Sequence, residues 1–187
     1  MNTDRLQSLR QAGIVAVLRA PSPDAALAAV DALVAGGITG LEVTYSTPDA
    51  PAVIAETLRR HPSAYVGAGT VRSAADAEAA VSAGASFLVS PGTTPRVAAA
   101  MVATGVVSMT GALTPSETMT ALEAGVEVVK LFPASSAGPA FLRALRAPFP
   151  EVAFMPTGGI DAAAIGPWMD AGAIALGAGG DLVPSSA

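Results

Sequence analysis

The sequence predicts an α/β fold, a (β/α)8 TIM barrel formed by a single domain over residues 1–187, in which the eighth helix is short or absent. Three observations predict this fold. A glycine-marked unit recurs along the chain, the apolar runs after the glycines are continuous, and alanine-rich helical stretches lie between these runs. An open, doubly wound sheet built from the same units is the alternative.

The repeat is marked by a small residue and a glycine, which precede an apolar run six times. The intervals between these glycines are 24, 47, 21, 20 and 47 residues, and each long interval holds one further strand-like run, at 64–70 or at 152–159. The chain therefore divides into eight units. The six glycines are Gly13, Gly37, Gly84, Gly105, Gly125 and Gly172.

Each glycine fits the left-handed position that ends a helix, and a strand then begins. Continuous apolar strands are typical of a parallel sheet buried on both faces. Helices are expected over 22–36, 73–84 and 114–125. The first opens with Ser22 and Pro23, and the last carries Thr114 and Glu117 at capping-box spacing. Only VPSSA follows the last strand region, so the eighth helix is expected to be missing or reduced to a turn.

The composition excludes several classes of protein. Hydrophobic residues make up 51% of the chain and charged residues 13%, which indicates a globular protein. The lack of cysteine excludes disulfides, thiolate metal sites and a cysteine nucleophile. A net charge of -5 argues against nucleic-acid binding, and no apolar run reaches the roughly 18–20 residues of a membrane span. The first residues lack a signal-peptide core, so the cytoplasm is the expected location.

Polar residues interrupt the apolar runs where strands are expected to end. In a (β/α)8 barrel these carboxyl ends carry the active site. His61 precedes the third strand instead, so we expect it in a surface loop at the opposite end. The interrupting residues are Arg19, Glu42, Thr44, Thr70, Ser90, Thr110, Lys130 and Thr157.

Lys130 is the only lysine in the chain, and it lies within the apolar run VVKLF. Desolvation favours the neutral form of an amine, and a neutral amine can attack a carbonyl carbon to form an imine. Glu42, within GLEVTY, is the expected partner, because a carboxylate there could move protons during such a reaction. The alternative is structural, an ion pair of Glu42 with Lys130 or Arg19 that closes the barrel interior.

Two glycine-rich turns follow the seventh and eighth strands, PTGGI at 156–160 and LGAGGD at 176–181. Loops at these places commonly form a phosphate site through backbone N–H groups and a helix N-terminus. The turns therefore predict a phosphate or carboxylate site, with tight turns alone as the alternative.

Over residues 9 to 184, several motifs resemble the 2-keto-3-deoxy-6-phosphogluconate (KDPG) and 4-hydroxy-2-oxoglutarate (KHG) aldolase family. They are GGITGLEVTYSTPDA, VGAGTV, SAGASFLVSPG, VVKLFPAS and PFPEVAFMPTGGI. The resemblance implies a class I, metal-free and cofactor-free aldolase on a (β/α)8 barrel, assembled as a homotrimer, with a small keto-acid substrate. KDPG would yield pyruvate and glyceraldehyde 3-phosphate, and KHG would yield pyruvate and glyoxylate.

The resemblance also implies roles for particular residues. Lys130 matches the Schiff-base lysine, and Glu42 matches the general acid/base. The other matching positions bind substrate: the pyruvate carboxylate at Thr70 and Thr157 with Arg19 nearby, the pocket walls at Pro91 and Phe132, and the phosphate at the backbone of Gly158 and Gly159.

Three positions depart from the family pattern. Gly180 stands where a phosphate-binding serine is usual, Ser46 where some members carry arginine, and Thr110-Gly111 where Pro-Gly is usual. The missing serine weakens the phosphate assignment and leaves an unphosphorylated substrate open. Asp181 matches a branch that acts on the galactonate epimer, although that branch typically lacks PTGG. That epimer's aldolase, or a non-catalytic barrel that holds a phosphorylated metabolite, is the alternative function.

Overall fold

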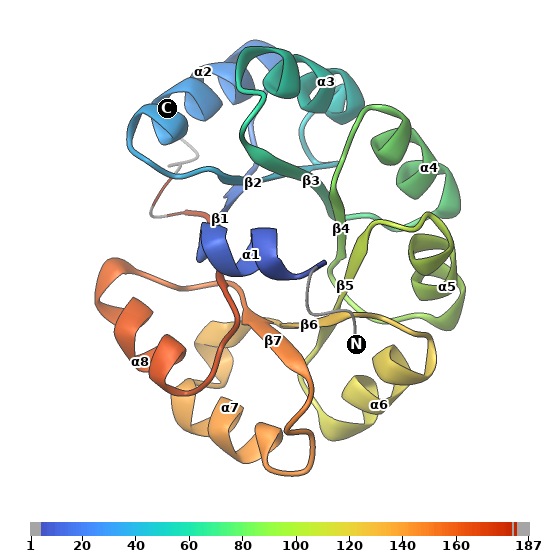
Figure 1. The fold of residues 1–187 in the computed structure, drawn as a ribbon, viewed down its shortest axis with the longest axis vertical. Coiled ribbons are helices and arrows are strands. Elements are labelled where there is room, and N and C mark those ends of the chain that lie inside the picture. Colours follow the sequence, from blue (N-terminus) through green and yellow to red (C-terminus); the bar gives the residue numbers. More distant parts are fainter. Residues whose placement is uncertain (1–4, 181, 183–187) are drawn as a thin grey trace.

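A computed structural model describes residues 5–180 and 182, and its strands form the predicted barrel (Figure 1). All observed strand pairs are parallel, and the order β7-β6-β5-β4-β3-β2-β1-β8 follows the chain except at the last strand. A parallel bridge between Thr157 and Gly177 joins the two outermost strands, so the sheet closes. The strands are β1 (Ile14–Leu18), β2 (Gly40–Thr44), β3 (Tyr65–Gly69), β4 (Phe87–Ser90), β5 (Val107–Ala112), β6 (Val128–Leu131), β7 (Ala153–Pro156) and β8 (Leu176–Ala178).

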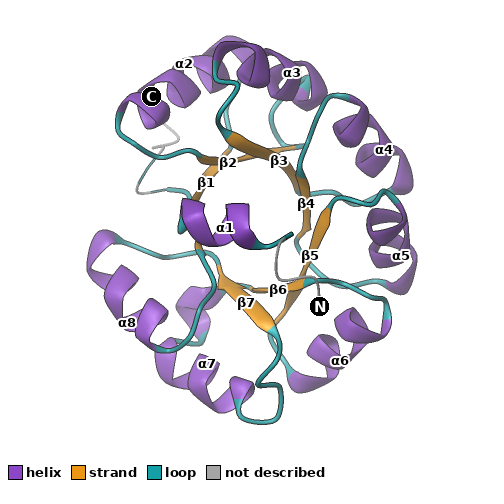
Figure 2. Ribbon diagram, in the orientation of Figure 1, coloured by secondary structure: helices purple, strands orange, loops and turns teal. Residues whose placement is uncertain are grey.

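Within residues 5–180 and 182, seven α-helices surround the strands, and α1 lies across one end of the barrel (Figure 2). Leu6 and Leu9 from this end of the chain join the inner cluster that contains Phe87 and Met109, so they plug the amino-terminal end. The α-helices are α1 (Gln7–Ala12), α2 (Pro23–Ala35), α3 (Ala50–Arg60), α4 (Ala74–Ser82), α5 (Pro95–Ala103), α6 (Pro115–Glu123), α7 (Pro139–Arg146) and α8 (Ile165–Asp170); the short 3-10 helices are η1 (Ala134–Ser136) and η2 (Ala162–Ala164).

The local signals that predict the helix ends are confirmed. All six repeat glycines have positive φ, between 63° and 99°, as a left-handed residue after a helix requires. The Ser22 side chain accepts a hydrogen bond from the Ala25 N–H, and Thr114 with Glu117 forms the complete capping box. Hydrogen bonds from the backbone N–H of Leu113 and the Thr114 side chain lower the pKa of the Glu117 carboxyl.

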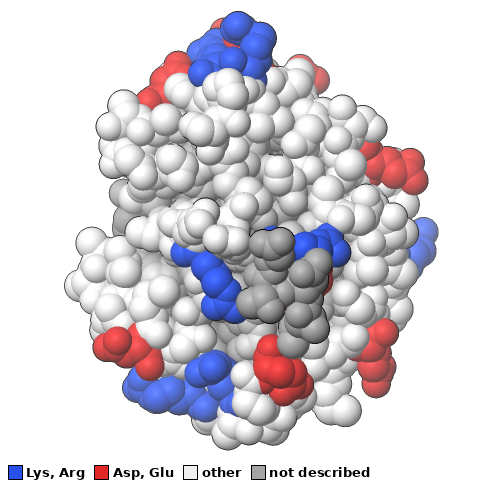
Figure 3. Space-filling view, viewed as in Figure 1, with Lys and Arg blue, Asp and Glu red and all other residues white. Residues whose placement is uncertain are grey.

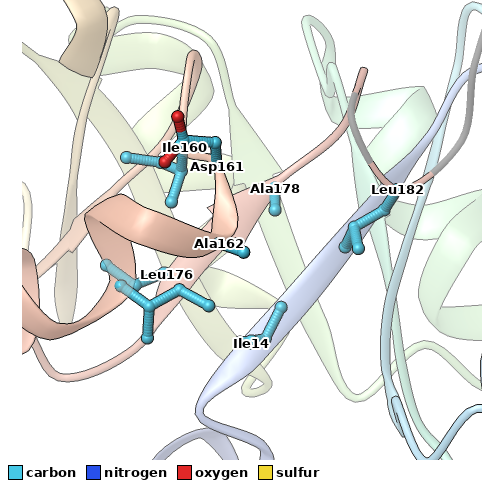
Figure 4. A pocket seen from close by; sticks show the side chains of 8 residues that line it. Ile14, Ile160, Asp161, Ala162, Leu176, Ala178 and Leu182 are labelled. Carbon is cyan, nitrogen blue, oxygen red and sulfur yellow. The ribbon is translucent and has the colours of Figure 1, made fainter.

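The predicted short or absent eighth helix concerns the residues after β8, of which residues 181 and 183–187 lie outside the described part of the chain. A cavity of about 130 Å³ lies between β1, β8 and the start of α8, on the outer face of the sheet (Figure 4). No predicted site residue lines it. Its walls are Ile14, Ile160, Asp161, Ala162, Ile165, Leu176, Ala178 and Leu182.

His61 follows α3 and precedes β3, at the end of the barrel that the sequence predicts. Its side chain is not a free surface group, however. The ring Nε2 lies 2.7 Å from Asp31 Oδ1 on α2, and the imidazole is half-buried. The sequence misses this contact because it joins two helices that are distant along the chain.

Candidate active site

Lys130 and Glu42 both point into the barrel interior. In a strand, successive side chains alternate between the two faces. Val128 belongs to the inner cluster whereas Val129 packs among the outer helices, so Lys130 returns to the inside. Leu41 and Val43 both pack outward, which directs Glu42 inward from the other side of the barrel. The Lys130 Nζ lies 3.7 Å from Glu42 Oε1, and the two side chains are only 4% and 1% exposed.

The Glu42 carboxylate is buried without a hydrogen bond. Neither carboxylate oxygen has a hydrogen-bond partner among residues 5–180 and 182, and 3.7 Å from the amine is an ion-pair distance that exceeds hydrogen-bond length. Buried polar groups in native proteins are almost always hydrogen-bonded, and an exception calls for an explanation. The carboxylate therefore has capacity to exchange protons with a bound molecule.

Gly69 provides the space that Glu42 occupies. A Cβ atom at residue 69 would lie 2.6 Å from both Cγ and Cδ of Glu42, which is closer than any ordinary contact. A similar relation holds at β8, where a Cβ at Gly177 would lie 2.8 Å from Thr157 Cγ2. Sequence reasoning names Glu42 and Thr157 but misses both glycines. Their signal is glycine within a strand, which marks a close approach of another group.

Phe132 lies beside the amine, and Thr157 and Thr70 supply hydroxyl groups at the ends of two other strands. The Lys130 Nζ lies 5.2 Å from the centre of the Phe132 ring, within range of a cation–π interaction. Thr157 follows β7 and is 4% exposed. Thr70 follows β3 with a φ of 58°, which is uncommon for a β-branched residue and often marks a functional position.

Three further hydroxyl groups predicted at the strand ends tie the backbone together. Thr44 donates to the Leu18 carbonyl across β1 and β2. Ser90 donates to the Gly92 carbonyl. Thr110 accepts a hydrogen bond from Thr93, whose loop follows β4. These hydroxyl groups fix the rim of the barrel and already form hydrogen bonds within the protein.

The glycine-rich turn after β7 reaches the same region. Gly158 and Gly159 have φ values of 95° and 71°, which favour glycine. A Cβ at Gly158 would lie 3.4 Å from Phe132 Cε2, so this turn contacts the ring beside the amine. Gly180, in the turn after β8, is exposed.

Arg19 and Pro91 lie at the ends of β1 and β4 with exposed side chains. Within the described part of the chain, Arg19 makes no ion pair. The structure thus brings Lys130, Glu42 and Phe132 into one constellation, and it leaves Arg19 and Pro91 at the rim.

The charged side chains outside the barrel interior lie on the surface. On the face that carries α1, basic and acidic side chains lie in separate small groups (Figure 3). Arg59 and Arg60 both donate to the partly exposed Glu56 carboxylate, and these hydrogen bonds lower its pKa to about 2. Residues 5–180 and 182 contain no group of three or more histidine, aspartate or glutamate side chains that could hold a metal ion, and no helix there is both long and apolar enough to cross a membrane.

A buried lysine amine lies beside a buried carboxylate inside a (β/α)8 barrel, an arrangement suited to an enzyme whose amine attacks a carbonyl carbon. The family model for KDPG and KHG aldolase matches residues 6–187. The chain belongs to this family.

Relatives and solved structures agree with this membership. The chain is 39% identical to the 2-dehydro-3-deoxy-phosphogluconate aldolase of Pseudomonas aeruginosa, over 84% of this chain and 73% of that protein. It is 33% identical to the 2-dehydro-3-deoxy-6-phosphogalactonate aldolase of Escherichia coli, over 90% of this chain and 83% of that protein. A KDPG aldolase structure from Legionella pneumophila, with pyruvate captured as a covalent carbinolamine, has a TM-score of 0.86 and 31% identity, over 95% and 87% of the two chains.

Proposed function

We propose that this protein cleaves 2-keto-3-deoxy-6-phosphogluconate to pyruvate and glyceraldehyde 3-phosphate by class I aldolase chemistry, and that it also accepts 4-hydroxy-2-oxoglutarate. The observation that carries the proposal is the buried Lys130 Nζ, 3.7 Å from a Glu42 carboxylate with no hydrogen-bond partner among the described residues. A structural ion pair leaves these carboxylate oxygens unexplained, whereas a proton shuttle requires them to be available.

The chemistry begins when the Lys130 amine attacks the C2 ketone of the substrate. Loss of water from the carbinolamine gives a protonated imine, and Glu42, directly or through water, carries the protons that this step requires. The imine then accepts the electron pair of the C3–C4 bond. As this bond breaks, the C4 hydroxyl loses its proton and leaves as the aldehyde. Protonation of the enamine at C3 and hydrolysis of the imine release pyruvate and restore the amine.

The substrate-binding roles follow the motifs. Thr70 and Thr157 would hold the pyruvate carboxylate, with the uncommitted Arg19 as a nearby cation. Phe132 and Pro91 would line the keto-acid portion, and the distance of 5.2 Å between Nζ and the Phe132 ring supports the first of these roles. The backbone of Gly158, Gly159 and Gly180 would meet the phosphate.

Cleavage of the C4 epimer, 2-keto-3-deoxy-6-phosphogalactonate, is the second candidate, favoured by the relative from Escherichia coli that is named for it. A barrel that binds a phosphorylated metabolite without turnover is the third. The rest of the proposal rests on the family resemblance: a homotrimer of single-domain chains, located in the cytoplasm, that needs no metal or cofactor. A comparison of turnover with both epimers and with 4-hydroxy-2-oxoglutarate, coupled to pyruvate detection, separates these candidates.

Trapping of the imine tests the central step. We expect pyruvate with borohydride to modify the protein irreversibly at Lys130, because the reductant converts the imine to a stable secondary amine. The chain has no other lysine, so peptide mapping needs only to separate this site from the N-terminal amine. Lys130→Arg keeps the positive charge but cannot form an imine, and it is the matched control. Intact protein that carries no adduct at Lys130 would overturn the proposal.

A further inference from the structure

Ser135, in η1 after β6, lies against the glycine turn after β7. A Cβ atom at residue 159 would lie 2.7 Å from Ser135 Cβ and 3.5 Å from its Oγ. Only glycine fits at residue 159 for this reason, in addition to its φ of 71°. The serine side chain therefore occupies space directly over the backbone of the turn.

The backbone holds this contact in one place. The Ser135 N–H donates to the Gly158 carbonyl at 3.0 Å, and the preceding Ala134 N–H donates to the Thr157 carbonyl at 2.9 Å. The loop after β6 is therefore bonded twice to the segment after β7. These bonds hold the Cβ atom of Ser135 beside the turn, and its side chain is exposed.

The Ser135 hydroxyl is available for a hydrogen bond to a bound molecule. Its Oγ makes no hydrogen bond to any residue of the described part of the chain, in contrast to the occupied hydroxyl groups of Thr44, Ser90 and Thr93. The adjoining Gly159 N–H donates no backbone hydrogen bond among these residues either. Two hydrogen-bond donors are thus available where the loops after β6 and β7 meet.

A series of neighbouring residues leads from the Lys130 amine to Ser135. Lys130 Nζ lies beside the Phe132 ring, a Cβ at Gly158 would meet that ring, and a Cβ at Gly159 would meet Ser135. Asp161 is the acidic residue next along the chain, and its Oδ1 accepts from the Ala164 N–H while the residue lines the outer cavity (Figure 4). This carboxylate is therefore engaged outside the turn.

We infer that the Ser135 hydroxyl binds the phosphate group of the substrate, together with the Gly159 N–H, and supplies the hydrogen bond that Gly180 cannot. The inference rests on the proposed function, because it assumes that a phosphorylated keto acid is bonded to Lys130 at the inner end of the site. Ser135 then determines specificity for the phosphorylated substrate over 4-hydroxy-2-oxoglutarate, which has no phosphate.

The test compares Ser135→Ala and Ser136→Ala on both substrates. Loss of a hydrogen bond to a charged group lowers affinity by about 10- to 100-fold. We therefore expect Ser135→Ala to lower kcat/KM for the phosphorylated keto acid by about that factor, mainly through KM, and to leave 4-hydroxy-2-oxoglutarate within about twofold. Ser136 is exposed and adjacent, and the three atoms nearest to a Cβ at Gly159 all belong to Ser135, so Ser136→Ala serves as the control and should match the wild type. Ser135→Thr keeps a hydroxyl and should retain most of the discrimination.

Borohydride trapping with pyruvate tests the aldolase proposal separately from the role of Ser135, since pyruvate has no phosphate. A normal adduct at Lys130 in Ser135→Ala, with equal losses on both substrates or with no loss on either, would overturn the role of Ser135 and leave the aldolase proposal intact. Wild-type protein that forms no adduct and turns over neither substrate would overturn the proposed function, and this inference with it.

Discussion

Replacement of Gly69 by alanine displaces Glu42 while both proposed catalytic side chains remain in the protein. The new Cβ would lie 2.6 Å from Glu42 Cγ and Cδ, whereas non-bonded carbon atoms prefer about 3.5–4.0 Å. The carboxylate must therefore move by about 1 Å. The φ of Gly69 lies outside the left-handed range, and the obstructing atoms belong to a flexible side chain. We expect the backbone to tolerate Gly69→Ala and Glu42 to give way.

A displacement of about 1 Å in a catalytic group lowers the rate by about 100-fold. Gly69→Ala should therefore lower kcat by about this factor and change KM little, because the residues proposed to bind the carboxylate and phosphate are unaltered. Initial rates of pyruvate release measure both constants. Gly166→Ala on α8 is the matched control, since its Cβ would meet nothing within 4 Å and its φ also allows alanine.

A kcat for Gly69→Ala within twofold of the wild type would refute the assignment of proton transfer to Glu42 in its present position. A large drop in melting temperature would mean that Glu42 cannot give way. In that case, addition of Glu42→Ala removes the obstructing atoms and should restore the melting temperature, whereas activity stays low.

Two further substitutions probe the phosphate region and the barrel interior. Gly180→Ser adds a hydroxyl where a new Cβ would meet nothing within 4 Å. It should raise kcat/KM for the phosphorylated keto acid about two- to tenfold and leave kcat/KM for 4-hydroxy-2-oxoglutarate unchanged. A lower kcat/KM for the phosphorylated substrate would contradict the phosphate assignment. Burial, with the nearby Glu127 carboxylate, raises the pKa of Tyr65 to about 12. Because an unfolded tyrosine ionises near pH 10, the wild type should lose stability as the pH rises from about 10 to 12, and Tyr65→Phe should reduce this loss. The buried Tyr65 hydroxyl has no hydrogen-bond partner among the described residues, so Tyr65→Phe should leave the free energy of unfolding in urea at pH 7 unchanged or raise it by about 1 kcal/mol. An undiminished loss between pH 7 and 11 would contradict this reading.

Features that depend on a few neighbouring residues could be predicted from the sequence. Gly37 and Gly125 end their helices with positive φ because the left-handed cap is a local geometry, and Thr114 with Glu117 caps α6 because their spacing alone brings them together. The polar residues at strand ends could also be placed, because a parallel barrel collects all carboxyl ends at one rim.

Features that depend on closure of the barrel could not be predicted from local pattern. The distance of 3.7 Å between Lys130 and Glu42 joins β6 and β2, which are not neighbours in the sheet, so it depends on the barrel radius and on which face each residue takes. Sequence reasoning proposed this pairing but could not decide between an ion pair and a proton shuttle. The missing hydrogen bonds of Glu42 favour the shuttle, and they are visible only in three dimensions.

The glycines that face inward explain how so small an interior holds these groups. Gly67 and Gly69 alternate along β3, so both face the barrel, one against the Phe87 ring and the other against Glu42. Gly177 on β8 gives the same room to Thr157. Glu42 and Thr157 thus each lie against a glycine of a neighbouring strand. The glycines of the motif VGAGT therefore matter because they leave room for other side chains. A methyl group at Gly69 would be enough to move the carboxylate that faces Lys130.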